Sequence, residues 1–179
     1  MKKIKYLDKE FKIFIPSKEI QNAISRIADK MNVDFKNKTP LFLSILNGSF
    51  MFAADLLKRL NFDCQISFVK LSSYCENSTT GKIEELIGFN ENIKDRIVII
   101  LDDIIDTGIT LEYIVNQIKE LQPAEIKVTA LFLKPQAYKK SISIDYLGIK
   151  IPDDFVIGFG LDYNGFGRNL KDIYSLNKI

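Results

Sequence analysis

Short runs of the chain are apolar at almost every position, and they alternate with segments whose apolar residues recur every three or four positions. The clearest run is residues 96–101 (RIVIIL), followed by a helical face that ends near Pro123 (Leu111, Ile114, Val115, Ile118 and Leu121). A strand that is apolar on both faces needs cover on both faces, and intervening helices allow successive strands to run parallel. We therefore predict an α/β fold with a mainly parallel central sheet flanked by helices.

The same two patterns place the other elements. We predict one helix that begins with Ser17 as its N-cap and buries one face (Ile20, Ala23, Ile24, Ile27, Ala28 and Met31), and another at residues 49–60. Further strands are expected at residues 11–16, 40–46, 64–71, 126–133 and 155–159. No internal repeat, low-complexity segment or linker divides the chain, so we expect residues 1–179 to form a single domain.

Charge and hydropathy limit the classes of partner. The chain has 25 Lys and Arg against 23 Asp and Glu, a formal net charge of +2, and no strongly basic tract. This composition gives no support for nucleic-acid binding. The first residues carry lysines, but Lys5, Asp8 and Lys9 interrupt the apolar stretch that a signal peptide needs, and no later run is long enough to span a bilayer. We expect a soluble cytoplasmic protein without a membrane partner.

The residue types that are missing limit the chemistry. Histidine is absent, which excludes histidine triads, histidine zinc sites and histidine proton shuttles. The two cysteines, Cys64 and Cys75, are too few for a metal or disulfide framework, and their role is open. Any proton transfer must therefore use Asp, Glu, Lys, Tyr or a thiol.

Three aspartates follow the strand at 96–101, namely Asp102, Asp103 and Asp106, and the stretch Thr-Gly-Ile-Thr then leads into a helix. Adjacent carboxylates repel each other, so their crowding suggests a magnesium ion or vicinal hydroxyls as a ligand. The backbone N–H groups and hydroxyls from Asp106 to Thr110 form an anion cradle at the helix N-terminus. Taken singly, Asp106 or Thr107 would only cap the helix and Asp102 would be solvated. Together they favour a ligand with sugar hydroxyls and a phosphate, bound at the carboxyl ends of the strands.

Residues 99–111 (IILDDIIDTGITL) resemble the phosphoribosyl pyrophosphate signature of the type I phosphoribosyltransferases. Four further segments, in the same order, are similar to the hypoxanthine-guanine branch of that family: 45–50 (ILNGSF), 71–89, 131–135 (LFLKP) and 151–170. The resemblance implies the type I fold with a small hood built from the terminal segments. It also implies purine salvage, in which the phosphoribosyl group passes from phosphoribosyl pyrophosphate to hypoxanthine, and to guanine, giving IMP (GMP) and pyrophosphate.

The resemblance further implies roles on the sugar-phosphate side. Asp102 and Asp103 would lie near the ribose hydroxyls and metal-bound water, and Asp162 would reach a second Mg²⁺ through water, which makes these three the predicted metal site. The 5′-phosphate would be held by residues 106–110 (Asp106, Thr107, Gly108, Ile109 and Thr110). The pyrophosphate would meet Arg168 and the loop after the strand at 40–46, where the family commonly has a non-proline cis peptide (Leu46, Asn47 and Gly48).

On the base side, the resemblance makes Asp106 the general base at the purine N7. Lys134 would bond the exocyclic oxygen, Phe155 would stack on the ring and Val156 would offer backbone contacts. A loop at 72–84 would close over the reacting centre with two residues of its own, Ser73 and Tyr74. Taken singly, Lys134 would more often be a solvated residue, Phe155 a core residue and Arg168 a surface residue.

Departures from the family pattern and two rival interpretations remain. Asn47 stands where many relatives have lysine, Asp102 replaces the frequent glutamate, and Ile109 sits where some relatives carry lysine. One rival is a regulator that keeps the fold and binds nucleotide or RNA without catalysis. The other is a receiver domain, which would need a further strand ending in Asp between Asp103 and Lys134, and none is predicted. The family implies a homodimer or homotetramer, and the ranking of hypoxanthine, guanine and xanthine stays open.

Overall fold

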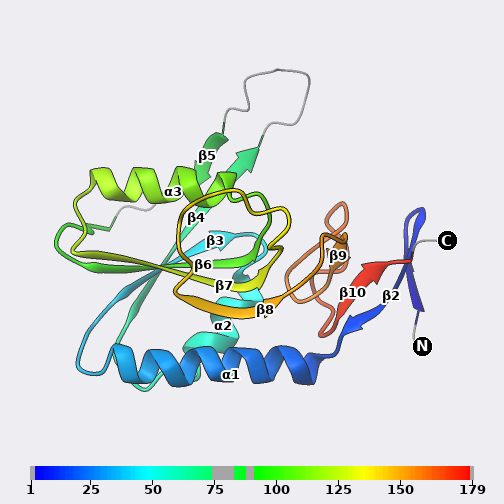
Figure 1. Cartoon of the computed structure of the whole chain (residues 1–179), viewed down its shortest axis with the longest axis horizontal. Coiled ribbons are helices and arrows are strands. Elements are labelled where there is room, and N and C mark those ends of the chain that lie inside the picture. The colour runs from blue at the N-terminus through cyan, green and yellow to red at the C-terminus, as the bar shows by residue number, and fades with distance from the viewer. Residues whose placement is uncertain (1–2, 74–82, 88–90, 178–179) are drawn as a thin grey trace.

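The structure is a computed structural model that describes residues 3–73, 83–87 and 91–177. Its larger sheet has the strand order β5-β4-β3-β6-β7-β8 (Figure 1). The bounds are β3 Leu41–Leu46, β4 Gln65–Ser73, β5 Ile83–Ile87, β6 Ile97–Ile105, β7 Glu125–Leu133 and β8 Tyr146–Lys150. Five of these strands are parallel and only β5 is antiparallel to its neighbour, which confirms the predicted α/β class.

Helices cover both faces of this sheet. Helices α1 (Ser17–Asp34) and α2 (Phe50–Leu57) lie on one face, and α3 (Ile109–Glu120) lies on the other (Figure 1). Each face has its own core: the apolar face of α1 packs with Phe42 and Phe52, and that of α3 packs with Leu43 and Val98. None of the described helices is long and apolar enough to cross a bilayer.

The predicted cap of α1 is wrong by one residue. Pro16, in extended conformation, occupies the N-cap position and makes no side-chain capping hydrogen bond. Ser17 is already inside the helix, and its backbone N–H donates a hydrogen bond of 2.7 Å to the Asp172 carboxylate near the other end of the chain. A distant aspartate, rather than the local serine, therefore satisfies one of the free N–H groups at this end of the helix.

A second sheet of four antiparallel strands forms the hood at the right of Figure 1. Its order is β1 (Lys3–Tyr6), β2 (Lys9–Ile15), β10 (Ile173–Leu176) and β9 (Val156–Ile157). Both terminal segments thus build the hood, as predicted. The strands expected at 11–16 and 155–159 belong here rather than to the parallel sheet. The second is only two residues long because Gly158 and Gly160, with φ of +108° and +101°, bend the chain away.

Candidate active site

The two adjacent aspartates are buried at the end of β6. The strand continues to Ile105, so Asp102 and Asp103 lie inside it rather than in the expected loop, and each is less than a tenth exposed. The solvated interpretation of Asp102 is therefore wrong. Side chains along β6 alternate between the two cores, but Leu101 and Ile104 both face the α1 side, so the alternation is interrupted at the aspartates. This interruption allows consecutive side chains to meet.

Burial sets the protonation of this pair. It raises the pKa of Asp102 well above its ordinary value, and the neighbouring Asp103 carboxylate adds to that rise. Burial also raises the pKa of Asp103, to about 6, although backbone hydrogen bonds, the Asp102 side chain and the charge of Arg168 limit the rise. The hydrogen bond between the two side chains raises the pKa of Asp102 and lowers that of Asp103, which makes Asp102 the donor of the pair. A divalent cation could take the place of this proton, because oxygen ligands suit Mg²⁺.

The loop after β3 lies against the same carboxylates. The Leu46–Asn47 peptide bond is cis, as the family resemblance suggested. A Cβ atom on Gly48 would overlap the carboxylate of Asp103, so only glycine allows this approach. Behind the loop, the buried hydroxyls of Ser44 and Ser49 are 2.7 Å apart, and Ser49 also donates to the carbonyl of Ile45. The chain thus holds the loop against the end of β6.

A segment between β9 and β10 brings a cation to the same place. The Arg168 guanidinium contacts the Asp162 carboxylate at 2.6 Å and donates to the Gly160 carbonyl at 2.7 Å. The second oxygen of Asp162 accepts a hydrogen bond from the Gly165 N–H at 2.7 Å. A Cβ on Gly160 would overlap the carbonyl oxygen of Gly48, so the two loops touch through their backbones. Asp103, Asp162, Arg168 and the loop at Gly48 are therefore neighbours.

The predicted anion cradle lies at the start of α3. Gly108 has φ of +85° and is the N-cap, without a side-chain capping hydrogen bond, and the Ile109 N–H reaches the Thr107 hydroxyl only at 3.5 Å. A cavity of about 130 Å³ is lined by Asp102 and residues 104–111. The helix N-terminus, two hydroxyls and successive N–H groups therefore surround a space suited to a phosphate.

On the base side, Lys134 follows β7 and contacts two carboxylates. Its ammonium is 2.7 Å from Asp106 and 3.2 Å from Asp153, and its side chain is only 10% exposed. Burial lowers the pKa of Lys134, but the hydrogen bonds to both aspartates outweigh this effect and the pKa is raised overall. Asp106 and Lys134 thus form one unit at the carboxyl ends of neighbouring strands.

Phe155 presents a partly exposed ring two residues after Asp153, the second partner of Lys134. It is 43% exposed and its far side packs on residues of the hood, with ring centroids 5.8 Å from Tyr163 and 6.3 Å from Phe11. The Lys9 ammonium lies 5.4 Å from its centroid, an added cation–π contact. Val156 is buried in β9 directly after it. Ser73 ends β4, and Tyr74 lies outside the described residues.

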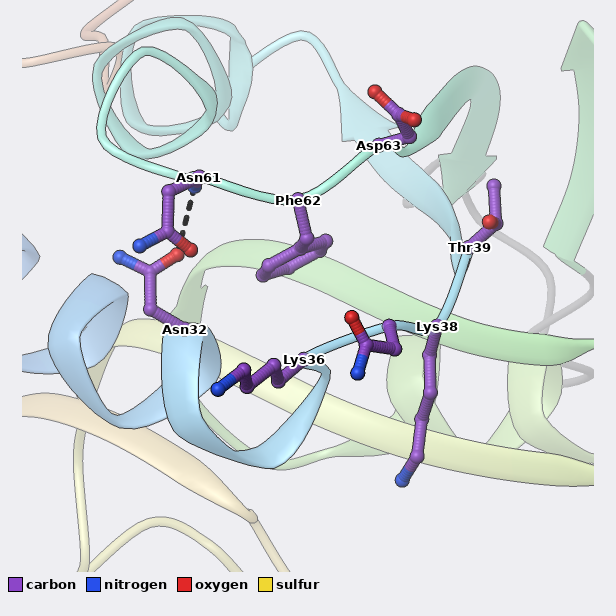
Figure 2. Close-up of a pocket in the computed structure, with 8 residues that line it drawn as sticks. Asn32, Lys36, Lys38, Thr39, Asn61, Phe62 and Asp63 are labelled. Carbon is purple, nitrogen blue, oxygen red and sulfur yellow. Dashed lines mark hydrogen bonds between the residues drawn. The ribbon is translucent and has the colours of Figure 1, made fainter.

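A larger cavity lies elsewhere. Figure 2 shows this space, of about 680 Å³, at the opposite ends of the strands, lined by Asn32 and residues 36–39 and 61–63. Asn32 and Asn61 are joined by a hydrogen bond of 2.8 Å (dashed in Figure 2), and the Phe62 ring packs on Phe35. No predicted site residue lines it, so volume alone does not locate the chemistry.

Comparison with known proteins decides the family. A model of the phosphoribosyl transferase domain matches residues 16–164. The chain belongs to this family. Hypoxanthine-guanine phosphoribosyltransferase of Streptococcus mutans is 35% identical to it over 98% of this chain and 97% of its own, and that of Bacillus subtilis is 34% identical over 90% and 91%. A crystal structure of the Bacillus anthracis enzyme has a TM-score of 0.87 and 34% identity, covering 93% of this chain and 98% of that one.

This phosphoribosyltransferase is therefore an enzyme, a pentosyltransferase. Asp153 and Gly160 contact its predicted site residues, yet sequence reasoning missed both. Asp153 adjoins another aspartate in "IPDD", and Gly160 is one of several glycines between 158 and 167, so neither carries a distinctive local signal.

Among the described residues, no group of three Asp, Glu, Cys or His side chains is arranged to hold a metal ion. The donor set nevertheless fits Mg²⁺, which usually binds one or two carboxylates together with substrate oxygens and water. Asp102 and Asp103 supply the two carboxylates. Asp162 is already paired with Arg168, which suits contact through water better than direct ligation.

Proposed function

We propose that the enzyme transfers the 5-phosphoribosyl group from phosphoribosyl pyrophosphate to hypoxanthine and guanine, releasing pyrophosphate. The observation that carries this proposal is the Asp106–Lys134 unit, which shares Asp106 with the phosphate cradle and contacts Asp153, two residues before the exposed Phe155 ring. A flat base on Phe155 would bring its ring nitrogens towards Asp106 and its 6-position towards Lys134. The similarity to hypoxanthine-guanine phosphoribosyltransferases supports the same substrates.

In this reaction the purine N9 forms a bond to the ribose C1′, and the bond from C1′ to the pyrophosphate oxygen breaks. The electron pair leaves with pyrophosphate, and positive charge builds on the ribose. The purine must lose a proton, and we assign its removal from N7 to Asp106, acting as the general base. Lys134 already occupies Oδ2 of Asp106, so the accepting atom is Oδ1. One positioned carboxylate is thus enough without histidine.

We assign the remaining site residues by what they present. The cradle of residues 106–110 would hold the 5′-phosphate, and the loop of residues 46–48 with Arg168 would hold the pyrophosphate. Asp102 and Asp103 would face the ribose hydroxyls, Val156 would offer backbone contacts to the base, and Ser73 and Tyr74 would close over the centre. Bound Mg²⁺, held by Asp102 and Asp103, would neutralise charge on the leaving pyrophosphate.

Lys134 decides the class of base. An ammonium has donors and no acceptor, so it matches a carbonyl oxygen at the purine 6-position and mismatches the amino group of adenine. Its burial makes the mismatch costly, because one N–H of the ammonium would face the amino group of adenine without an acceptor. We therefore expect 6-oxopurines to be used and adenine to fail.

The test is pyrophosphate release from phosphoribosyl pyrophosphate with hypoxanthine, guanine, xanthine and adenine in turn. Lys134→Ala should lower kcat/KM for hypoxanthine by roughly 10- to 100-fold, the range for a lost charged hydrogen bond, and leave phosphoribosyl pyrophosphate binding intact. Lys36→Ala, at the opposite end of the strands, is the matched control. Adenine used as well as hypoxanthine by the wild-type enzyme would overturn the assignment.

The rival interpretations and the assembly have their own tests. A non-catalytic regulator would release no pyrophosphate with any base. The receiver domain would need a further strand ending in Asp between Asp103 and Lys134. The described chain has only α3 and then β7 there, and β7 ends at Leu133, so this interpretation is not supported. The homodimer or homotetramer remains a prediction, for which light scattering on purified protein is the measurement.

A further inference from the structure

The ammonium of Lys134 has two carboxylate partners, and only one of them belongs to the proposed reaction. Asp106 contacts it at 2.7 Å and Asp153 at 3.2 Å. The Lys134 side chain is 10% exposed, whereas that of Asp153 is 58% exposed and lies at the rim of the site. The proposed reaction therefore gives no reason for the contact with the second partner, Asp153.

The donors of Lys134 supply that reason. An ammonium has three N–H groups in tetrahedral arrangement and rotates freely about its C–N bond. With a single partner, the long side chain could still change its torsions and shift the nitrogen while keeping that one hydrogen bond, which would redirect the other two donors. Two partners at separate positions, Asp106 and Asp153, restrict this movement and hence fix the direction of the third donor.

The backbone places Asp153 for this purpose. Ile151 donates its N–H to the carbonyl of Leu133 at 2.8 Å, which ties the start of the segment to the residue before Lys134. The N–H of Asp154 donates to the Pro152 carbonyl at 2.8 Å and closes a tight turn that presents Asp153. Phe155 follows immediately, so one short segment carries both the exposed ring and the second partner of the lysine.

We propose that Asp153 is a positioning residue for base recognition, which aims the third N–H of Lys134 at the oxygen in the 6-position of a purine lying on Phe155. It does not touch the base or the reacting atoms. Asp153 also shares the ammonium with Asp106, so that Lys134 is not drawn fully onto the general base. This inference rests on the proposed function.

The experiment compares Asp153→Ala, Asp153→Glu and Asp63→Ala, which removes a carboxylate from the far cavity. KM for hypoxanthine, KM for phosphoribosyl pyrophosphate, and competitive inhibition by unsubstituted purine, which has no oxygen at position 6, are measured for each. Asp153→Ala should raise KM for hypoxanthine about three- to fivefold, the upper part of the range for a partly exposed ion pair. The other two constants should stay within about twofold. Asp153→Glu should recover part of the loss, and Asp63→Ala should behave as wild type.

Equal weakening of hypoxanthine and unsubstituted purine would show that the substitution acts through Phe155, and would overturn the proposal. An unchanged KM for hypoxanthine in an active Asp153→Ala enzyme would overturn it as well, while leaving the proposed function intact. A wild-type protein that releases no pyrophosphate would refute the proposed function and this inference together. Because the Asp153 side chain is largely exposed, its truncation leaves no buried cavity.

Discussion

Replacing Gly160 with alanine should damage the enzyme without touching any side chain of the site. Gly160 has φ of +101°, a conformation that side chains rarely adopt, and an added Cβ would overlap the carbonyl oxygen of Gly48. That oxygen belongs to the backbone of the loop proposed to hold pyrophosphate, so it cannot turn away as a flexible side chain would. Either this loop or the segment of Gly160 must move.

The size of the effect follows from the geometry. Ordinary non-bonded contact requires the two atoms to separate by about 1 Å or more. A misplacement of about 1 Å in a positioning group costs on the order of 10²-fold in rate. The unfavourable φ adds roughly 1–2 kcal/mol of lost stability. We therefore expect kcat/KM for phosphoribosyl pyrophosphate to fall about 100-fold, with a modest drop in Tm.

Gly165 provides the matched control. It has a similar φ of +84°, but an added Cβ would meet nothing within 4 Å, so Gly165→Ala carries the backbone strain without the overlap. Pyrophosphate release is measured at varied phosphoribosyl pyrophosphate, and thermal melting is measured for both variants. Similar losses of Tm with a large difference in kcat/KM are expected. If both variants keep kcat/KM within about threefold of each other, the contact between the two loops has no catalytic role and the reasoning is refuted.

Three further outcomes are expected. Asp106→Asn should keep the fold and slow turnover by roughly 10²- to 10⁴-fold, the usual range for a general base, and near-normal turnover at saturating substrates would rule out its role. Exhaustive chelation should abolish activity and added Mg²⁺ should restore it, whereas full activity without divalent ions would defeat the metal assignment. In the absence of metal, the free energy of unfolding should fall as the pH rises from about 4 to about 6. The pKa values of Asp102 and Asp103 are raised in the folded state, so over this range the folded protein keeps protons that the unfolded chain releases. Asp102→Asn should make this decline shallower in chemical denaturation at each pH, and an unchanged slope would contradict the shared proton.

The sequence predicted the elements that have strong local patterns. The apolar faces of α1 and α3 and the strands β3, β4, β6 and β7 follow from the apolar pattern alone, since burial on one or both faces dictates which positions are apolar. Strands β1, β5, β8 and β10 were not predicted. They are only four or five residues long, too short to show a clear pattern, and they form by pairing with their neighbours, as when β10 pairs with β2 across most of the chain.

The site was predictable in its residues and much less in its contacts. Asp102, Asp103 and the cradle stand out because three carboxylates and Thr-Gly-Ile-Thr share one short stretch of the sequence. That Asp103 fits against Gly48, or that Asp153 contacts Lys134, depends on where separate loops meet in space. Ser17 shows the same limit, because its N–H is bound by Asp172 from the opposite end of the sequence.

The division into two sheets has a consequence for how such an enzyme can change. The groups proposed for ribose, phosphate and metal come mainly from the parallel sheet and its loops, whereas the surface under the base comes from the hood, with Lys134 as the contribution of the parallel sheet. Substitutions that reshape the hood around Phe155 therefore leave the sugar-phosphate machinery in place. Exchanging hood residues and Lys134, in evolution or by engineering, can therefore change the base that the enzyme prefers, while the donor of the phosphoribosyl group stays the same.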